Sequence, residues 1–134
     1  MAELIEKTLT TLLALLIVAS AGIQIINTGS RVVEDCYKTL LVNQLTTNLD
    51  NGIWRIFIRE VDYYSFKIFC PNKLRIHADG NKVIIEYLAF EQWHVDRRTY
   101  PILIRILREP TKEGTYFVAL SRSEREVLVN FLEV

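Results

Sequence analysis

The feature that most constrains this chain is a long stretch without charge near its start. No charged residue occurs between Thr8 and Ser30, although charged residues make up 24% of the sequence. The part from Leu9 to Ile26 is almost wholly apolar. As an α-helix it would be about 27 Å long, close to the hydrocarbon thickness of a bilayer. Such a helix is not water-soluble alone, so we predict that it lies in a membrane or packs in a filament.

This segment is expected to stay in the protein rather than act as a cleaved secretory signal. Secretory signals begin with a basic region, whereas Glu3 and Glu6 precede this helix with Lys7 as the single base. Small residues within it allow other helices to approach closely. The apolar side chains expected to form the assembly surface are Leu9, Leu12, Leu13, Leu15, Leu16, Ile17, Val18, Ile23, Ile25 and Ile26.

A second helical pattern follows the uncharged stretch. Apolar residues recur there at steps of about four, which is typical of a helix with one apolar face. The residues of this stripe are Val33, Tyr37, Leu40, Leu41, Leu45 and Leu49. A stop signal at Asp50-Asn51-Gly52 places the helix end at about residues 50 to 58. We therefore divide the chain into an apolar helix, residues 1–30, and a globular body, residues 31–134.

From Val61 onward the apolar period changes from four to two, which predicts β-strands. We expect five or six short antiparallel strands, with a hairpin turn at Asp79-Gly80. Their expected ranges are 64–70, 74–77, 82–90, 102–107, 116–120 and 126–131. The form of residues 91–100 is not readable from the pattern. The predicted fold class is α+β, in which the amphipathic half of the helix packs on a small antiparallel β domain.

No combination of residues in the sequence predicts an enzyme. His77 and His94 each have an aspartate two residues on, which is more often surface polarity than an active site. Neither a nucleophile elbow nor a phosphate-binding loop is present. We expect no cofactor, no metal and no small-molecule substrate. The charge balance of sixteen bases and sixteen acids gives no reason to expect nucleic acid as a partner.

Three further features have alternative interpretations. Cys36 and Cys70 are a candidate disulfide if the body lies outside the cell, or else two buried thiols. Glu3 and Glu6 either favour the positive end of the helix dipole or pair with the N-terminal amine of a neighbouring subunit. Trp54 and Trp93 are either core residues or part of an exposed interaction patch.

The N-terminal sequence MAELIEKTLTTLLALLIVASAGIQIIN, with the apolar stripe through Leu49, resembles the type IV pilin superfamily. The β body with its PNKLRIHADGNKVIIEY hairpin looks more like archaeal type IV pilins and archaellin-like proteins. This resemblance implies a subunit that waits in the membrane and then joins copies of itself in an extracellular helical filament, for surface adhesion. The alternative is a single-span, membrane-anchored extracytoplasmic domain, acting as a minor or stator-like component of a motility or secretion apparatus.

Overall fold

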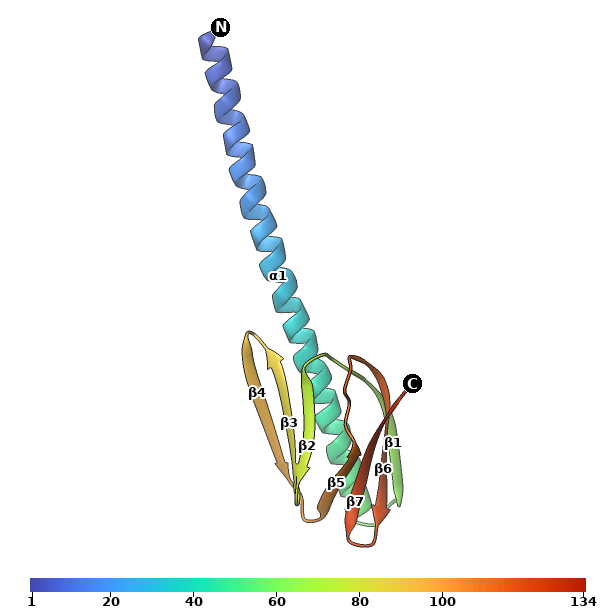
Figure 1. Cartoon of the computed structure of the whole chain (residues 1–134). Coiled ribbons are helices and arrows are strands. Elements are labelled where there is room, and N and C mark those ends of the chain that lie inside the picture. The colour runs from blue at the N-terminus through green and yellow to red at the C-terminus, as the bar shows by residue number, and fades with distance from the viewer. The chain divides into compact units, whose positions relative to one another are not determined.

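The computed structural model describes all 134 residues as one long helix and seven strands (Figure 1). This architecture confirms the α+β class, with a helix that packs on a small β domain. The elements are α1 (Ala2–Phe57), β1 (Tyr63–Cys70), β2 (Leu74–Asp79), β3 (Lys82–Ala89), β4 (Gln92–Thr99), β5 (Leu103–Arg108), β6 (Gly114–Ser123) and β7 (Glu126–Glu133).

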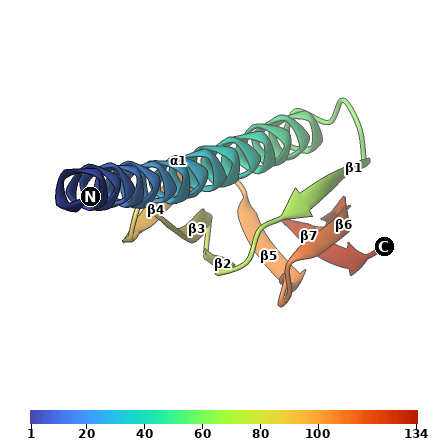
Figure 2. The ribbon, with the colours of Figure 1, turned by 90° about the horizontal axis from the view of Figure 1, so that it is seen from above.

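The chain divides into two compact units, Met1–Asp35 and Cys36–Val134. The first unit is the N-terminal part of α1 and contains no buried residue. The second unit holds the remainder of α1 together with all seven strands. Figure 2 shows both sheets on one side of the second unit's part of α1.

The helix continues through the predicted stop signal because Gly52 is a packing residue there. A Cβ atom added to Gly52 would lie 2.5 Å from Cδ1 of Tyr64, so only glycine lets the helix approach β1 this closely. The end comes at Phe57, where Arg59 adopts a φ of 63°. The Glu60 amide then donates to the Arg55 carbonyl at 3.0 Å, and the Arg59 amide to Ile56 at 3.1 Å. These two bonds form a Schellman motif, which satisfies carbonyls of the last turn.

The buried face of the helix is shorter than the sequence predicts. Leu41, Leu45 and Leu49 are buried, as expected for the apolar stripe. Val33, Tyr37 and Leu40 belong to the same stripe but are exposed, which corrects the predicted start of the buried face. At its C-terminal end, the buried face continues past the predicted stop signal at residues 50–52, since Ile53 and Ile56 are fully buried.

Four strands form one sheet in the order β1-β6-β7-β5. The pairs β1–β6 and β6–β7 are antiparallel, whereas β5 pairs with β7 in parallel. The prediction of antiparallel strands throughout is therefore wrong for β5. The reason is topological: β5 does not pair with β6, the next strand in the chain, but with the strand after it.

The other three strands form a second sheet in the order β2-β3-β4, which is antiparallel throughout. Gly80 has a φ of 62° in the turn between β2 and β3, as the Asp-Gly signal predicts. Residues 91–100, to which the sequence pattern assigns no structure, contain β4. Its turn is formed by Phe90 and Glu91, with φ values of 53° and 60°. Turns of this kind usually contain Asn or Gly, so this hairpin carries no sequence signal.

One core joins the two sheets and the buried face of α1. The largest fully buried side chain is Phe131 of β7, and Leu45, Ile53, Ile76 and Leu120 are similarly enclosed. At the edge of the core, the Tyr100 hydroxyl donates a hydrogen bond to Asp50 Oδ1. Burial and this contact with a carboxylate raise the pKa of Tyr100. The bond fixes the segment after β4 against the helix.

Candidate assembly surface

The apolar side chains of the first unit are all exposed to solvent. The ten residues that the sequence assigns to the assembly surface are between 57% and 72% exposed: Leu9, Leu12, Leu13, Leu15, Leu16, Ile17, Val18, Ile23, Ile25 and Ile26. They lie on every side of the helix, since consecutive residues such as Leu15 to Val18 differ by about 100° around the axis. The exposed area is therefore a complete apolar sleeve, which we call the assembly sleeve (Leu9–Ile26).

The assembly sleeve meets the physical requirements of a membrane span. The helix is long and apolar enough to cross a bilayer by its length and composition. Its first hydroxyl groups are satisfied internally, because Thr8, Thr10 and Thr11 donate to the carbonyls four residues earlier at 2.8–2.9 Å. A hydroxyl bonded to its own helix needs no partner from the surroundings, which lowers the cost of placing it in lipid.

Glu3 and Glu6 lie on the exposed helix at the start of the assembly sleeve. Together with Lys7, Thr10 and Thr11 they form an open, solvent-exposed face of the helix. The ion pairs of Arg98 with Asp50, Arg98 with Asp96, and Arg105 with Glu126 lie elsewhere. Both carboxylates are thus accessible to another chain. Two roles for these carboxylates remain predictions: interaction with the positive end of the helix dipole, and pairing with the N-terminal amine of a neighbouring chain.

Both cysteines are free thiols in the structure. Cys36 is exposed on α1, whereas Cys70 is 1% exposed at the end of β1. Burial raises the pKa of the Cys70 thiol to about 12. Because the thiolate is the reactive form, Cys70 is protected from alkylation and oxidation, and Cys36 is the accessible thiol of the pair.

The two tryptophans are both half exposed. Trp93 is 49% exposed on β4, with the Arg75 guanidinium 5.2 Å from its ring centre. Trp54 is 45% exposed and contacts the rings of Phe57 and Tyr100 edge-on, at centroid distances of 5.8 and 6.4 Å. Trp93 is therefore part of an exposed patch, whereas Trp54 borders the core.

The two histidines lie in different surroundings. His77 is exposed on β2. His94 stacks on Tyr87 at 5.1 Å, with Nε2 3.0 Å from the Ala89 carbonyl oxygen. No group of three or more His, Cys, Asp or Glu side chains lies close enough to hold a metal ion.

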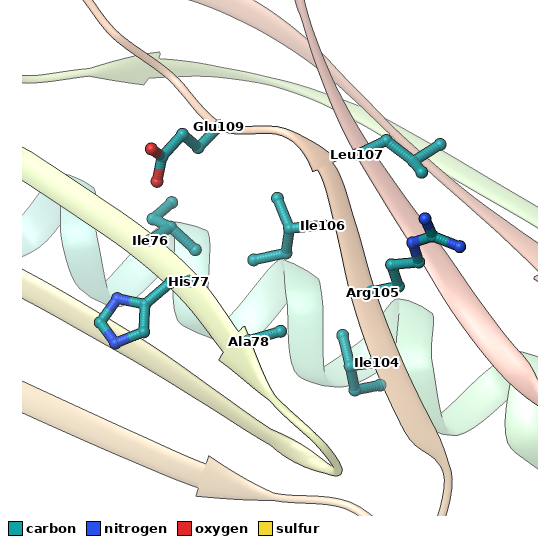
Figure 3. Close-up of a pocket in the computed structure, with 8 residues that line it drawn as sticks. All are labelled: Ile76, His77, Ala78, Ile104, Arg105, Ile106, Leu107 and Glu109. Carbon is teal, nitrogen blue, oxygen red and sulfur yellow. The ribbon is translucent and has the colours of Figure 1, made fainter.

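The body also has a groove of about 360 Å³ between β2 and β5 (Figure 3). Polar and apolar atoms both contribute to its lining, and Figure 3 shows the His77 ring directed away from it. We call it the β2–β5 groove, and define it by Ile76, His77, Ala78, Ile104, Arg105, Ile106, Leu107 and Glu109. Nothing in the sequence pattern predicts it, because it arises where two sheets meet.

The chain was also compared with known proteins. No family model, no curated protein and no solved structure matches it.

Proposed function

We propose that this protein is the structural subunit of an extracellular type IV pilus-like filament that assembles through its apolar N-terminal helix. The observation that carries the proposal is the assembly sleeve, in which every large apolar side chain from Leu9 to Ile26 is exposed. Complete burial of each such side chain is worth about 1.5–3 kcal/mol. A helix that is apolar on all sides needs partners on all sides, and lipid or a bundle of identical helices supplies them.

The step from membrane to filament would depend on packing rather than on the hydrophobic effect. Lipid tails are as apolar as leucine, so helices associate in a membrane through close contact and hydrogen bonds. The space around Gly22 and Gly29 is open, with no atom within 4 Å of a Cβ built at either position. Neighbouring helices of the filament would approach most closely at these glycines. At the start of the assembly sleeve, Glu6 would pair with the N-terminal amine of a neighbouring subunit.

In such a filament the β body would form the outer surface and carry adhesion. Half-exposed aromatic and arginine side chains such as Trp93 and Arg75 suit contacts with other macromolecules. The subunit would stand in the membrane before assembly and outside the cell afterwards.

Electron microscopy of the purified native protein tests this proposal. Long, thin helical filaments with apolar helices at the centre would support it, and discrete detergent-dependent particles would contradict it. A variant with Leu16→Asp and Ile17→Asp should not assemble, because charges in a helix bundle have no partner. The matched control is Leu103→Asp with Leu107→Asp, which places the same two charges on half-exposed residues of the body and should still assemble.

A second candidate function is a single-span anchor that holds the body outside the cytoplasm, as a minor or stator-like component of a motility or secretion apparatus. It is favoured by the finding that α1 alone is long and apolar enough to cross a bilayer. An anchor of this kind would remain in discrete particles after detergent extraction and would never form filaments, so the same microscopy separates the two functions.

A further inference from the structure

The two sheets of the body differ in the face that they turn away from the core. In the three-stranded sheet, every strand carries a charged side chain on this outer face: Arg75 on β2, Glu86 on β3 and Arg97 on β4. A sheet face in contact with water normally has this polar character. In the four-stranded sheet, the two central strands, β6 and β7, have mainly uncharged residues on the outer face.

The burial of alternate residues shows which side chains point outward. Tyr116, Val118 and Leu120 of β6 are buried, so the residues between them lie on the outer face. The pairing of β6 with β1 and with β7 then gives the outward residues of those strands. We call the uncharged centre of this face the outer patch, and define it by Phe117 and Ser121 of β6, Leu128 and Leu132 of β7, and Tyr63 and Phe69 of β1.

The outer patch has the composition of a protein interface. Charged side chains surround it, with Lys67 on β1, Arg105 on β5 and Glu126 at the start of β7. Three of its large side chains are well exposed: Tyr63 (54%), Leu132 (38%) and Phe69 (37%). An exposed apolar centre with a charged rim is typical of a surface that binds another protein.

We propose that the outer patch is a contact surface between two copies of this chain, whose four-stranded sheets pack face to face. Sheets that pack in this way lie about 10 Å apart, with their strands aligned to within about 30°. The two-fold axis runs parallel to the strands, between β6 and β7. It therefore places β6 of one copy over β7 of the other, and β1 over β5.

The register of the sheet supports a second copy as the occupant. Ser121 pairs with Leu128 across β6 and β7, and Phe117 pairs with Leu132. The two-fold axis between these strands therefore brings each Leu128 over the small Ser121 of the second copy. It also brings each Phe117 over a Leu132, so that apolar side chains meet. A surface that fits itself in this way is the requirement for an isologous dimer.

The charged rim is compatible with the same arrangement. Tyr63, Leu128 and Arg105 lie in one row across the sheet. The axis places Arg105 over the Tyr63 ring of the second copy, where a cation–π contact can form. Lys67 lies in the row of Leu132, which β5 does not reach, so it meets no basic side chain of the opposite β5.

The area of the face is sufficient for a reversible dimer. Four strands about 4.8 Å apart and about 25 Å long form a face of roughly 500 Å². Two copies would bury about 1,000 Å² in total, which is the lower limit for a specific interface. We therefore expect a weak dimer that forms and separates readily.

The direction of the axis also suits a chain that is anchored in a membrane. Figure 1 shows the strands of this sheet running lengthwise beside α1. An axis parallel to the strands makes residues 36–57 of the two copies run in the same direction, as two copies in one membrane require. This last step rests on membrane insertion of α1, whereas the contact between the patches does not.

Other occupants fit less well. A lipid surface would leave the polar side chains of Ser121 and Asn130 without partners. A small molecule needs a concave site, and a sheet face is nearly flat. An unrelated protein would not need the pairing of large and small residues about one axis, so the position of cross-links between copies separates it from a second copy.

Cross-linking of the full chain in detergent micelles tests the proposal. Cys36→Ser first removes the accessible thiol, since Cys70 is buried. On this background, Ser121→Cys should place two cysteine Cα atoms about 11 Å apart in the dimer, and a bismaleimide of matching length should link them. Lys67→Cys is the control, because residues of β1 would lie about 17 Å apart and the same reagent should not link them.

A charge in the outer patch should separate the copies. Leu128→Lys, made together with Ser121→Cys, should reduce the cross-linked fraction at least tenfold. The matched control is Val95→Lys, which places the same charge on the outer face of the three-stranded sheet, where Val95 is 50% exposed. It should leave the cross-linked fraction unchanged. Neither side chain belongs to the core, so thermal unfolding of the body should be similar in both variants.

No linkage through the cysteine at position 121, equal linkage at position 67, or linkage that persists in Leu128→Lys would overturn the proposal. If Leu128→Lys does not fold, Leu132→Lys decides instead, because that side chain is more exposed. The variant with Leu16→Asp and Ile17→Asp separates this inference from the filament proposal. It should lose filaments and keep the cross-linked dimer.

Discussion

Leu16 and Leu45 are leucines of the same helix, and their surroundings are opposite. Leu16 is 65% exposed in a segment with apolar residues on every side, whereas Leu45 is 1% exposed on a stripe flanked by polar residues. Helix propensity does not distinguish them, since both halves form one continuous α1. The spacing of apolar residues distinguishes them. A single apolar stripe is buried by the two sheets of the same chain, whereas a helix that is apolar on all sides needs partners from outside the chain.

The same substitution in the two halves tests this comparison most strongly. Leu45→Asp places a charge in the core without a partner and should cost at least about 4 kcal/mol, which unfolds the body. Leu16→Asp should leave the unfolding transition of the body unchanged and reduce the fraction recovered with membranes. Thermal unfolding by circular dichroism and membrane fractionation measure the two effects. A body that unfolds equally in both variants would show that the halves are not independent.

High pH should destabilise the body and leave the assembly sleeve unaffected. The pKa of Cys70 is raised to about 12 in the folded state from an ordinary value of 9, and that of Tyr100 is raised as well. Groups with raised folded pKa values stabilise the protein below the unfolded pKa, and this stability is lost as pH rises from about 9 toward 12.

The expected loss is roughly 2–4 kcal/mol. Urea denaturation at pH 8 and pH 11 measures it, with Tyr100→Phe as the variant that should flatten the pH dependence. A free energy of unfolding that is equal at both pH values would contradict the assignment.

Three glycines of α1 extend the comparison between the exposed and the buried half of the helix. Gly52→Ala brings a Cβ atom to 2.5 Å from Tyr64 and should destabilise the body by about 1–3 kcal/mol. Gly22→Ala and Gly29→Ala meet no atom, so each should strengthen the helix of the isolated subunit by up to about 1 kcal/mol. Chemical denaturation and helicity in micelles measure these effects. In the proposed filament, Gly22→Ala would reduce filament length if neighbouring helices contact that position.

The smallest effect is expected at the exposed charges beside α1. Arg98→Ala removes the 3.5 Å contacts with Asp50 and Asp96, which are partly exposed, and should cost less than about 1 kcal/mol. A double-mutant cycle with Asp50→Asn isolates the pair. A coupling above about 2 kcal/mol would mean that Arg98 helps to hold β4 on the helix, beyond what a surface ion pair contributes.

Local patterns predicted much of this fold, and long-range pairings escaped prediction. The uncharged stretch predicted α1, and Asp79-Gly80 predicted the β2–β3 hairpin. The β3–β4 hairpin was unreadable because Phe90 and Glu91 adopt positive φ values without a glycine. The parallel pairing of β5 with β7 was not predicted, because the spacing of apolar residues within a strand does not indicate which distant strand it pairs with. For the same reason the assembly sleeve was predictable from sequence, whereas the β2–β5 groove was not.

The position of β7 has a consequence for the order in which the chain folds. β7 follows the other six strands in the chain, yet it lies inside the four-stranded sheet, between β6 and β5. Until residues 126–133 arrive, β5 has no strand to pair with and Phe131 is missing from the core. Long-range pairings of this kind form late and slowly. A chain that emerges N-terminus first would therefore have α1 available for a bilayer before its body can fold. The order of synthesis would then place membrane insertion of the helix before folding of the body.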